Sequence, residues 1–157
     1  MSIMREMGDL PIPPGSRQEE PNRLRLWSLN NNFRKTSMNV AIVGSRSFED
    51  YARLAKCVAE VLADRRILMS EVQVISGGAV GADALAERYS REVLGKEPHI
   101  FAADRKQFGR SAGPKHDNEI VEAADLVIAF PGKGRGTWNS IYLAWKKGIP
   151  VDVFPIR

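Results

Sequence analysis

From residue 38 onward, short apolar runs alternate with segments of helical periodicity, and this alternation constrains the fold more than any other feature. The runs are rich in β-branched residues and short enough to be strands, whereas the segments between them repeat apolar positions at helical spacing. Such an alternation predicts a parallel sheet covered by helices on both faces. Right-handed crossovers favour an α/β fold of the Rossmann-like, doubly wound type with five strands. The expected strands are 39–44, 72–76, 99–102, 125–130 and 151–154.

Four helices are expected between these strands. The first should begin at Ser47-x-x-Asp50, which resembles a capping box with Asp in place of Glu. Glycines after the second and fourth helices should stop them, and Trp145 in the last helix is expected to face the core. The remaining expected helices are 82–94, 114–124 and 137–147.

The composition fits one globular domain without disulfides. The chain has 157 residues, 43% hydrophobic and 27% charged, which suits a core of ordinary size. Cys57 is the only cysteine, so no intrachain disulfide or Cys-based metal site can form, and a cytoplasmic location is expected. No apolar run reaches the roughly 20 residues of a membrane helix, so no membrane partner is expected. The net charge of +4 suits an anionic small molecule but is too small to predict nucleic-acid binding.

The N-terminal residues differ from the rest of the chain. Residues 1–37 hold Pro11, Pro13, Pro14 and Pro21 and show no sustained hydrophobic period. They predict an extension that is either disordered or an arm at an interface. The expected organisation is therefore an extension over 1–37 and a Rossmann-like domain over 38–157.

Three loops that follow expected strands are rich in glycine, and each leads into an expected helix. The first loop is 44–46, the second is 76–83 and the third is 131–137. Glycine lets the backbone approach a ligand closely, and the first N–H groups of a helix are unpaired, so such loops favour phosphate. Because any tight strand–helix turn favours glycine, one loop is weak support, but three in a short chain predict nucleotide binding. The predicted binding residues are Gly44, Ser45, Arg46, Ser76, Gly77, Gly78, Ala79, Gly81, Asp83, Gly132, Lys133, Gly134, Gly136 and Thr137.

Several polar residues have two interpretations. Asp83 suits a ribose hydroxyl or a first-turn helix charge, and Thr137 suits a ligand or a helix cap. The polar, basic loop after the third strand is a candidate lid, and His116 beside it is a candidate acid or base. No P-loop, nucleophile elbow or dinucleotide fingerprint occurs, so no catalytic residue is predicted.

The three loops, taken together, are also similar to a known family. The sequences Val43-Gly44-Ser45-Arg46-Ser47-Phe48 and Ser76-Gly77-Gly78-Ala79-x-Gly81-Ala82-Asp83 are followed by Ala112-Gly113, Ala124-Asp125-x-x-Ile128-Ala129-Phe130 and Gly136-Thr137. Residues 38–155 thereby resemble the YspA/YpsA-related branch of the SLOG superfamily, which also includes DprA and the LOG phosphoribohydrolases. The resemblance implies a Rossmann-like domain that binds a nucleotide or nucleotide-derived ligand at these loops.

The chain departs from this family at two places. Relatives often carry an Arg-Asn pair where this chain has His116-Asp117, which removes an arginine that could reach a phosphate. LOG enzymes carry a glutamate in the motif P-G-G-x-G-T-x-x-E, and Ser140 stands at that position here. Because a hydroxyl cannot replace a carboxylate in proton transfer, LOG-type hydrolysis is not expected.

Three functions follow as hypotheses. The first is a nucleotide-binding module, acting as a ligand sensor or a sequestering protein. The second is an N-glycoside hydrolase that uses another carboxylate, with Asp83, Asp104, Asp117 and Glu119 as candidates. The third is single-stranded nucleic-acid binding through the basic loop 105–115, which ranks last because Phe108 is its only aromatic residue. A homo-oligomer is a further expectation, because parallel-sheet domains of this size often pair. Trp138 and Trp145 share one face of the last expected helix and suit either a core or an interface, with the core favoured for Trp145.

Overall fold

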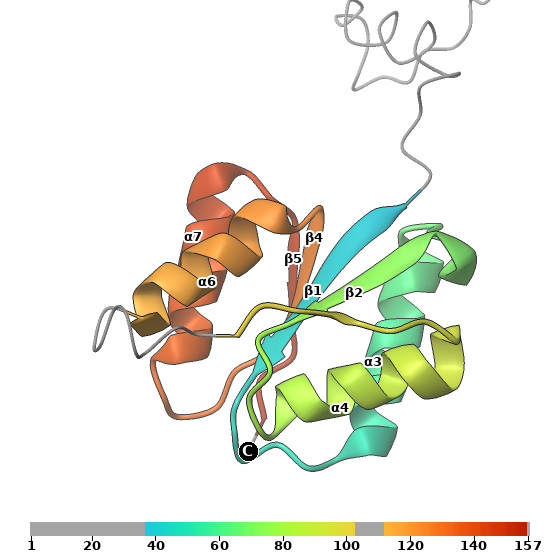
Figure 1. Cartoon of the computed structure of the whole chain (residues 1–157), viewed down its shortest axis with the longest axis horizontal. Helices are drawn as coiled ribbons and strands as arrows, with labels where there is room; N and C mark the ends of the chain where they lie inside the picture. The colour runs from blue at the N-terminus through green and yellow to red at the C-terminus, as the bar shows by residue number, and fades with distance from the viewer. Residues whose placement is uncertain (1–36, 103–111, 157) are drawn as a thin grey trace, which may run out of the picture. The chain divides into compact units, whose positions relative to one another are not determined.

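The computed structural model describes residues 37–102 and 112–156, and these residues form an α/β unit around one parallel sheet (Figure 1). The strand order is β3-β2-β1-β4-β5, and every pairing is parallel. This order and direction confirm the predicted five-stranded, doubly wound, Rossmann-like fold. The strands are β1 (Met38–Gly44), β2 (Val72–Ser76), β3 (His99–Ile100), β4 (Leu126–Phe130) and β5 (Val151–Val153).

Helices cover both faces of the sheet, with α3 and α4 on one side and α6 and α7 on the other (Figure 1). A short 3₁₀ turn, η2 (Met69–Glu71), precedes β2, and a π-helical turn, η3 (Ser90–Leu94), extends α4. The helices are α3 (Tyr51–Asp64), α4 (Ala82–Tyr89), α6 (Ala112–Ala123) and α7 (Gly136–Lys147).

The central strand β1 is buried on both faces, which explains its uninterrupted apolar sequence. Val40 and Ile42 pack under α3 and α4, whereas Ala41 and Val43 pack under α6 and α7. Successive side chains of a strand point to opposite faces, so a strand between two helical layers must be apolar at every position. The two cores therefore meet at β1.

The strand order reverses between β1 and β4. The chain leaves β1 toward α3 on one face and leaves β4 toward α7 on the other, so the two connections diverge at the carboxyl ends of neighbouring strands. Gly44 pairs with Phe130 at that end, and the Ser45 N–H donates to the Phe130 carbonyl over 2.9 Å. In open α/β sheets, such a reversal leaves a crevice outside the strand ends.

The predicted capping box is wrong. Helix α3 begins at Tyr51, and Asp50 is its N-cap, with a side-chain oxygen that accepts the Arg53 N–H over 3.0 Å. Ser47 instead contacts the Ser45 hydroxyl over 2.8 Å. Phe48 lies between these two residues and is buried in the core, where its ring stacks on Phe130 at a centroid distance of 5.0 Å. The chain therefore enters the core before the helix begins.

The expectation that Trp145 faces the core is also wrong. Trp145 is 72% exposed, and Ala144 beside it is fully buried against the sheet. Small residues on the buried face of α7, including Ser140, bring the helix close to the strands, so large rings fit only on the outer side. Trp138 and Tyr142 lie exposed on α7 as well.

Candidate functional site

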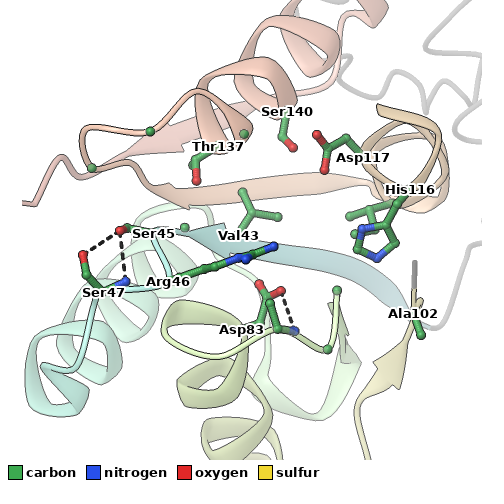
Figure 2. Close-up of a pocket in the computed structure, with 18 residues that line it drawn as sticks. Val43, Ser45, Arg46, Ser47, Asp83, Ala102, His116, Asp117, Thr137 and Ser140 are labelled. Carbon is green, nitrogen blue, oxygen red and sulfur yellow. Dashed lines mark hydrogen bonds between the residues drawn. The ribbon is translucent and has the colours of Figure 1, made fainter. Parts of the chain in front are cut away.

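A pocket of about 750 Å³ opens at the carboxyl ends of the strands, where the strand order reverses (Figure 2). Its volume lies in the range of small-molecule sites in proteins. All three glycine-rich loops contribute to its wall, and α6 closes one side. The predicted residues that line it are Gly44, Ser45, Arg46, Gly77, Gly78, Ala79, Asp83, Gly132, Gly134, Gly136 and Thr137.

Three predicted residues do not line the pocket. Ser76 is fully buried, and its hydroxyl donates to Glu87 Oε2 over 2.6 Å and accepts the Gly78 N–H over 3.1 Å. Lys133 is exposed and does not line the pocket. Gly81 joins two loops, because its φ is +80° and a Cβ atom there would lie 2.4 Å from the carbonyl oxygens of Ser45 and Arg46. Ser76 and Gly81 therefore shape the loops that carry the pocket residues.

The first loop places one cation at the pocket. Arg46 extends into it below Val43 (Figure 2). Within the described ranges, neither an ion pair nor a hydrogen bond engages its guanidinium group. An arginine without a protein partner offers a planar fork of donors to a carboxylate or phosphate.

The second loop carries Asp83 at the start of α4. Asp83 Oδ2 accepts the Ala79 N–H over 3.1 Å. Burial raises the pKa of Asp83 to about 6, the Ala79 hydrogen bond lowers it, and neighbouring Glu87 raises it further. Gly77 lies against this carboxylate, since a Cβ atom there would lie 2.8 Å from Asp83 Oδ2. Asp83 is thus a pocket carboxylate that takes up a proton nearer neutral pH than an ordinary aspartate does.

The third loop brings the start of α7 to the pocket. Gly134 and Gly136 border open space, since a Cβ atom on either would meet nothing within 4 Å. Among the described residues no side chain caps α7, and its first turn holds no acidic residue. Thr137 is therefore a wall residue and not a cap. Uncapped N–H groups and the helix dipole favour an anion at this end of the pocket.

Helix α6 adds three pocket residues that were not among the predicted binding positions, the apolar Ile120 and the polar His116 and Asp117. The His116 Nε2 atom lies in contact with the Phe101 carbonyl oxygen, and the ring packs on Gly77. Asp117 Oδ2 accepts a hydrogen bond from Asn139 Nδ2 over 3.2 Å, and burial raises the pKa of this carboxyl. The sequence indicated His116 as a candidate acid or base and Asp117 as a candidate carboxylate, but it did not include them among the binding residues, since spacing alone could not place α6 over the pocket.

Ser140 is a further polar pocket residue that was not among the predicted binding positions. It is 3% exposed and lies one turn into α7, with its hydroxyl directed into the pocket beside Asp117 and Thr137 (Figure 2). The signal that could have found it is the helical spacing, because Thr137 and Ser140 are three residues apart and share a face.

The other candidates lie elsewhere. Asp104 and most of the basic loop fall at 103–111, outside the described residues. Glu119 is exposed and does not line the pocket.

The described part of the chain holds no group of three or more His, Cys, Asp or Glu side chains suited to a metal ion. In the same part, no helix combines the length and apolar character needed to cross a bilayer.

The chain was compared with known proteins and families. Residues 17–151 match the sequence profile of the family described as DNA recombination-mediator protein A. This match supports the resemblance at the level of the SLOG superfamily, and it extends upstream of residue 38. No curated protein matches the chain.

Proposed function

The chain belongs to the DNA recombination-mediator protein A family, and we propose that it is a binding module for a nucleotide or nucleotide-derived ligand. The module acts as a sensor or by sequestering its ligand, and within the superfamily it stands nearest the YspA/YpsA-related branch. The observation that carries this proposal is the convergence of three glycine-rich loops on one pocket at the strand reversal.

The phosphate of the ligand binds between the start of α7 and Arg46. A micromolar ligand requires about 8 kcal/mol of binding free energy. A single helix dipole supplies about 0.3–1 kcal/mol, and a hydrogen bond to a charged group supplies about 1.5–3 kcal/mol. Several donors must therefore act together, and the uncapped turn of α7 and the unengaged guanidinium supply them.

Thermal unfolding of the full chain with mononucleotides, NAD and ADP-ribose tests the proposal. A ligand present at about 100 times its Kd should add roughly 2.7 kcal/mol to the free energy of unfolding. Chromatography of the ligand after incubation separates plain binding from N-glycoside cleavage. If no nucleotide raises the melting temperature, the proposal is wrong.

Arg46→Ala should weaken binding at least tenfold, because it removes a charged donor at the pocket. The matched control is Lys56→Ala, which removes one positive charge from the exposed side of α3, away from the pocket. Equal affinity in both variants would exclude a direct role for Arg46 and leave only the general effect of net charge.

Single-stranded DNA binding is a second candidate, and the description of the matched family favours it. It predicts an affinity for an unlabelled oligonucleotide that falls steeply with salt, whereas a mononucleotide in the pocket is less sensitive. Competition between the two ligands would indicate that the DNA backbone uses the same pocket. Binding of DNA without competition would place it on another surface.

A further inference from the structure

Among the described residues, the hydroxyl of Ser140 is a pocket group without a hydrogen-bond partner. The residue is 3% exposed, and the described residues offer its Oγ no hydrogen bond. The group is nevertheless directed into the pocket (Figure 2). Because Ser140 lines the pocket and no described residue engages its hydroxyl, this group is free to bond to an atom that enters the pocket.

Asp117 presents a complementary group from α6. Asn139 donates to its Oδ2, which fixes the side chain toward α7, and the described residues donate no hydrogen bond to its Oδ1. An ionised carboxylate only accepts hydrogen bonds and repels a phosphate, so the ligand atom beside it must be a donor. Asp117 and Ser140 line the same pocket and together offer an acceptor next to a group that both donates and accepts.

The position of Ser140 along α7 indicates which part of the ligand supplies the donor. Ser140 lies three residues after Thr137, which corresponds to a rise of about 4.5 Å from the proposed phosphate site. In a nucleotide the sugar follows the phosphate, so its hydroxyls reach this depth before the base does. Vicinal hydroxyls match an adjacent carboxylate and hydroxyl, whereas a 2′-deoxyribose lacks one of the two donors.

We propose that Asp117 and Ser140 form a sugar-hydroxyl subsite that makes the pocket prefer ribonucleotides to 2′-deoxyribonucleotides. This inference rests on the proposed function, because it concerns the sugar of the same ligand. It adds two binding residues and a ribose preference to that function.

Calorimetric titration of the full chain with ADP and 2′-deoxy-ADP tests the subsite. The wild type should bind ADP at least tenfold more tightly, the change expected for one hydrogen bond to a charged group. Asp117→Asn keeps the shape and the Asn139 contact, and Ser140→Ala removes only the hydroxyl. The variant that loses the partner of the 2′-hydroxyl should bring the affinity ratio close to one and leave the affinity for 2′-deoxy-ADP within about twofold. The other variant should weaken both nucleotides by a similar factor, because both carry the 3′-hydroxyl.

Glu119→Gln is the matched control, because it makes the same type of change on an exposed part of α6 outside the pocket. It should keep the full preference for ADP. Equal binding of the two nucleotides by the wild type, or an undiminished preference in both pocket variants, overturns the subsite and leaves the proposed function standing. If neither ADP nor 2′-deoxy-ADP binds, the subsite is overturned, and the proposed function falls with it only if NAD, ADP-ribose and the other mononucleotides also leave the melting temperature unchanged.

Discussion

At the scale of single residues, the glycines of the three loops have different structural roles. Gly81 adopts a positive φ, and its missing Cβ leaves space for two carbonyl oxygens of the first loop. Gly44 is packed against Ala82 and Phe130, whereas Gly134 faces open space. From the sequence, all three were interpreted as ligand-binding glycines. The sequence alone cannot distinguish a glycine required for close backbone packing from one that leaves room for a ligand.

Gly81→Ala should therefore destabilise the fold by more than about 3 kcal/mol, since it combines an unfavourable φ with a clash against backbone atoms. Urea unfolding measures the change. Gly95→Ala is the control with a similar φ of +69° and no neighbour within 4 Å, and it should cost only about 1–2 kcal/mol. Equal losses in the two variants would mean that the contact between the loops adds nothing.

Asp83 should make stability depend on pH. Its folded pKa of about 6 lies above the unfolded value, so the native state holds the proton more tightly. The free energy of unfolding should therefore fall as pH rises from about 4 to about 6 and level off above that range. Asp83→Asn should be more stable than the wild type at pH 7, by on the order of 2 kcal/mol, and should lose this advantage below pH 4.

Urea unfolding of both proteins at pH 4 and pH 7 measures this difference. The amide can still accept the Ala79 N–H, so the comparison isolates the charge. A wild type as stable as the variant at pH 7 would contradict the burial of an ionised carboxylate at this position.

At the scale of elements, most strands and helices could be predicted, and the misplaced features have local causes. Continuous apolar runs identified β1, β2 and β4, because central strands need apolar residues on both faces. At the edge of the sheet, β3 pairs through only two residues, so the expected strand 99–102 is shorter than its composition suggests. Trp145 was misplaced because helical periodicity gives a face and cannot say how much room the sheet leaves.

The two faces of α7 should respond differently to substitution. Trp145→Ala removes an exposed ring and should change the free energy of unfolding by no more than about 0.5 kcal/mol. Ala144→Leu enlarges a fully buried residue and should cost about 1–3 kcal/mol. Denaturant midpoints compare the two variants. A large loss in Trp145→Ala would show that the ring is covered by something beyond the described residues.

At the scale of the described unit, the sheet order and the pocket follow from the alternation of elements, but the acidic side of the pocket does not. Parallel strands bring their carboxyl ends to one edge, so the sequence predicted that the three loops would meet. It named His116 and Asp117 as candidate functional groups but did not include them among the binding residues, because packing between α6 and α7 is not visible in spacing. Tertiary contacts therefore supply the part of the site that local patterns leave out.

A surface ion pair ties the end of α3 to the edge strand β5. Arg65 Nε donates to Asp152 Oδ2 over 2.7 Å, and both side chains are about one-third exposed. Asp152→Asn should cost at most about 1 kcal/mol at low salt, because water screens the charges. The cost should shrink in 1 M salt. Unfolding at two ionic strengths measures this, and a loss independent of salt would point to packing.

The Ala82 N–H donates to the Ser45 carbonyl over 3.1 Å at the junction that Gly81 permits. Two segments about 35 residues apart in the chain are thereby fastened together as part of the native core. The conformational entropy of these two loops is therefore lost during folding. A ligand that enters the pocket does not have to order them again, which lowers the entropic cost of binding. A substitution at Gly81, which does not itself line the pocket, should therefore alter ligand affinity.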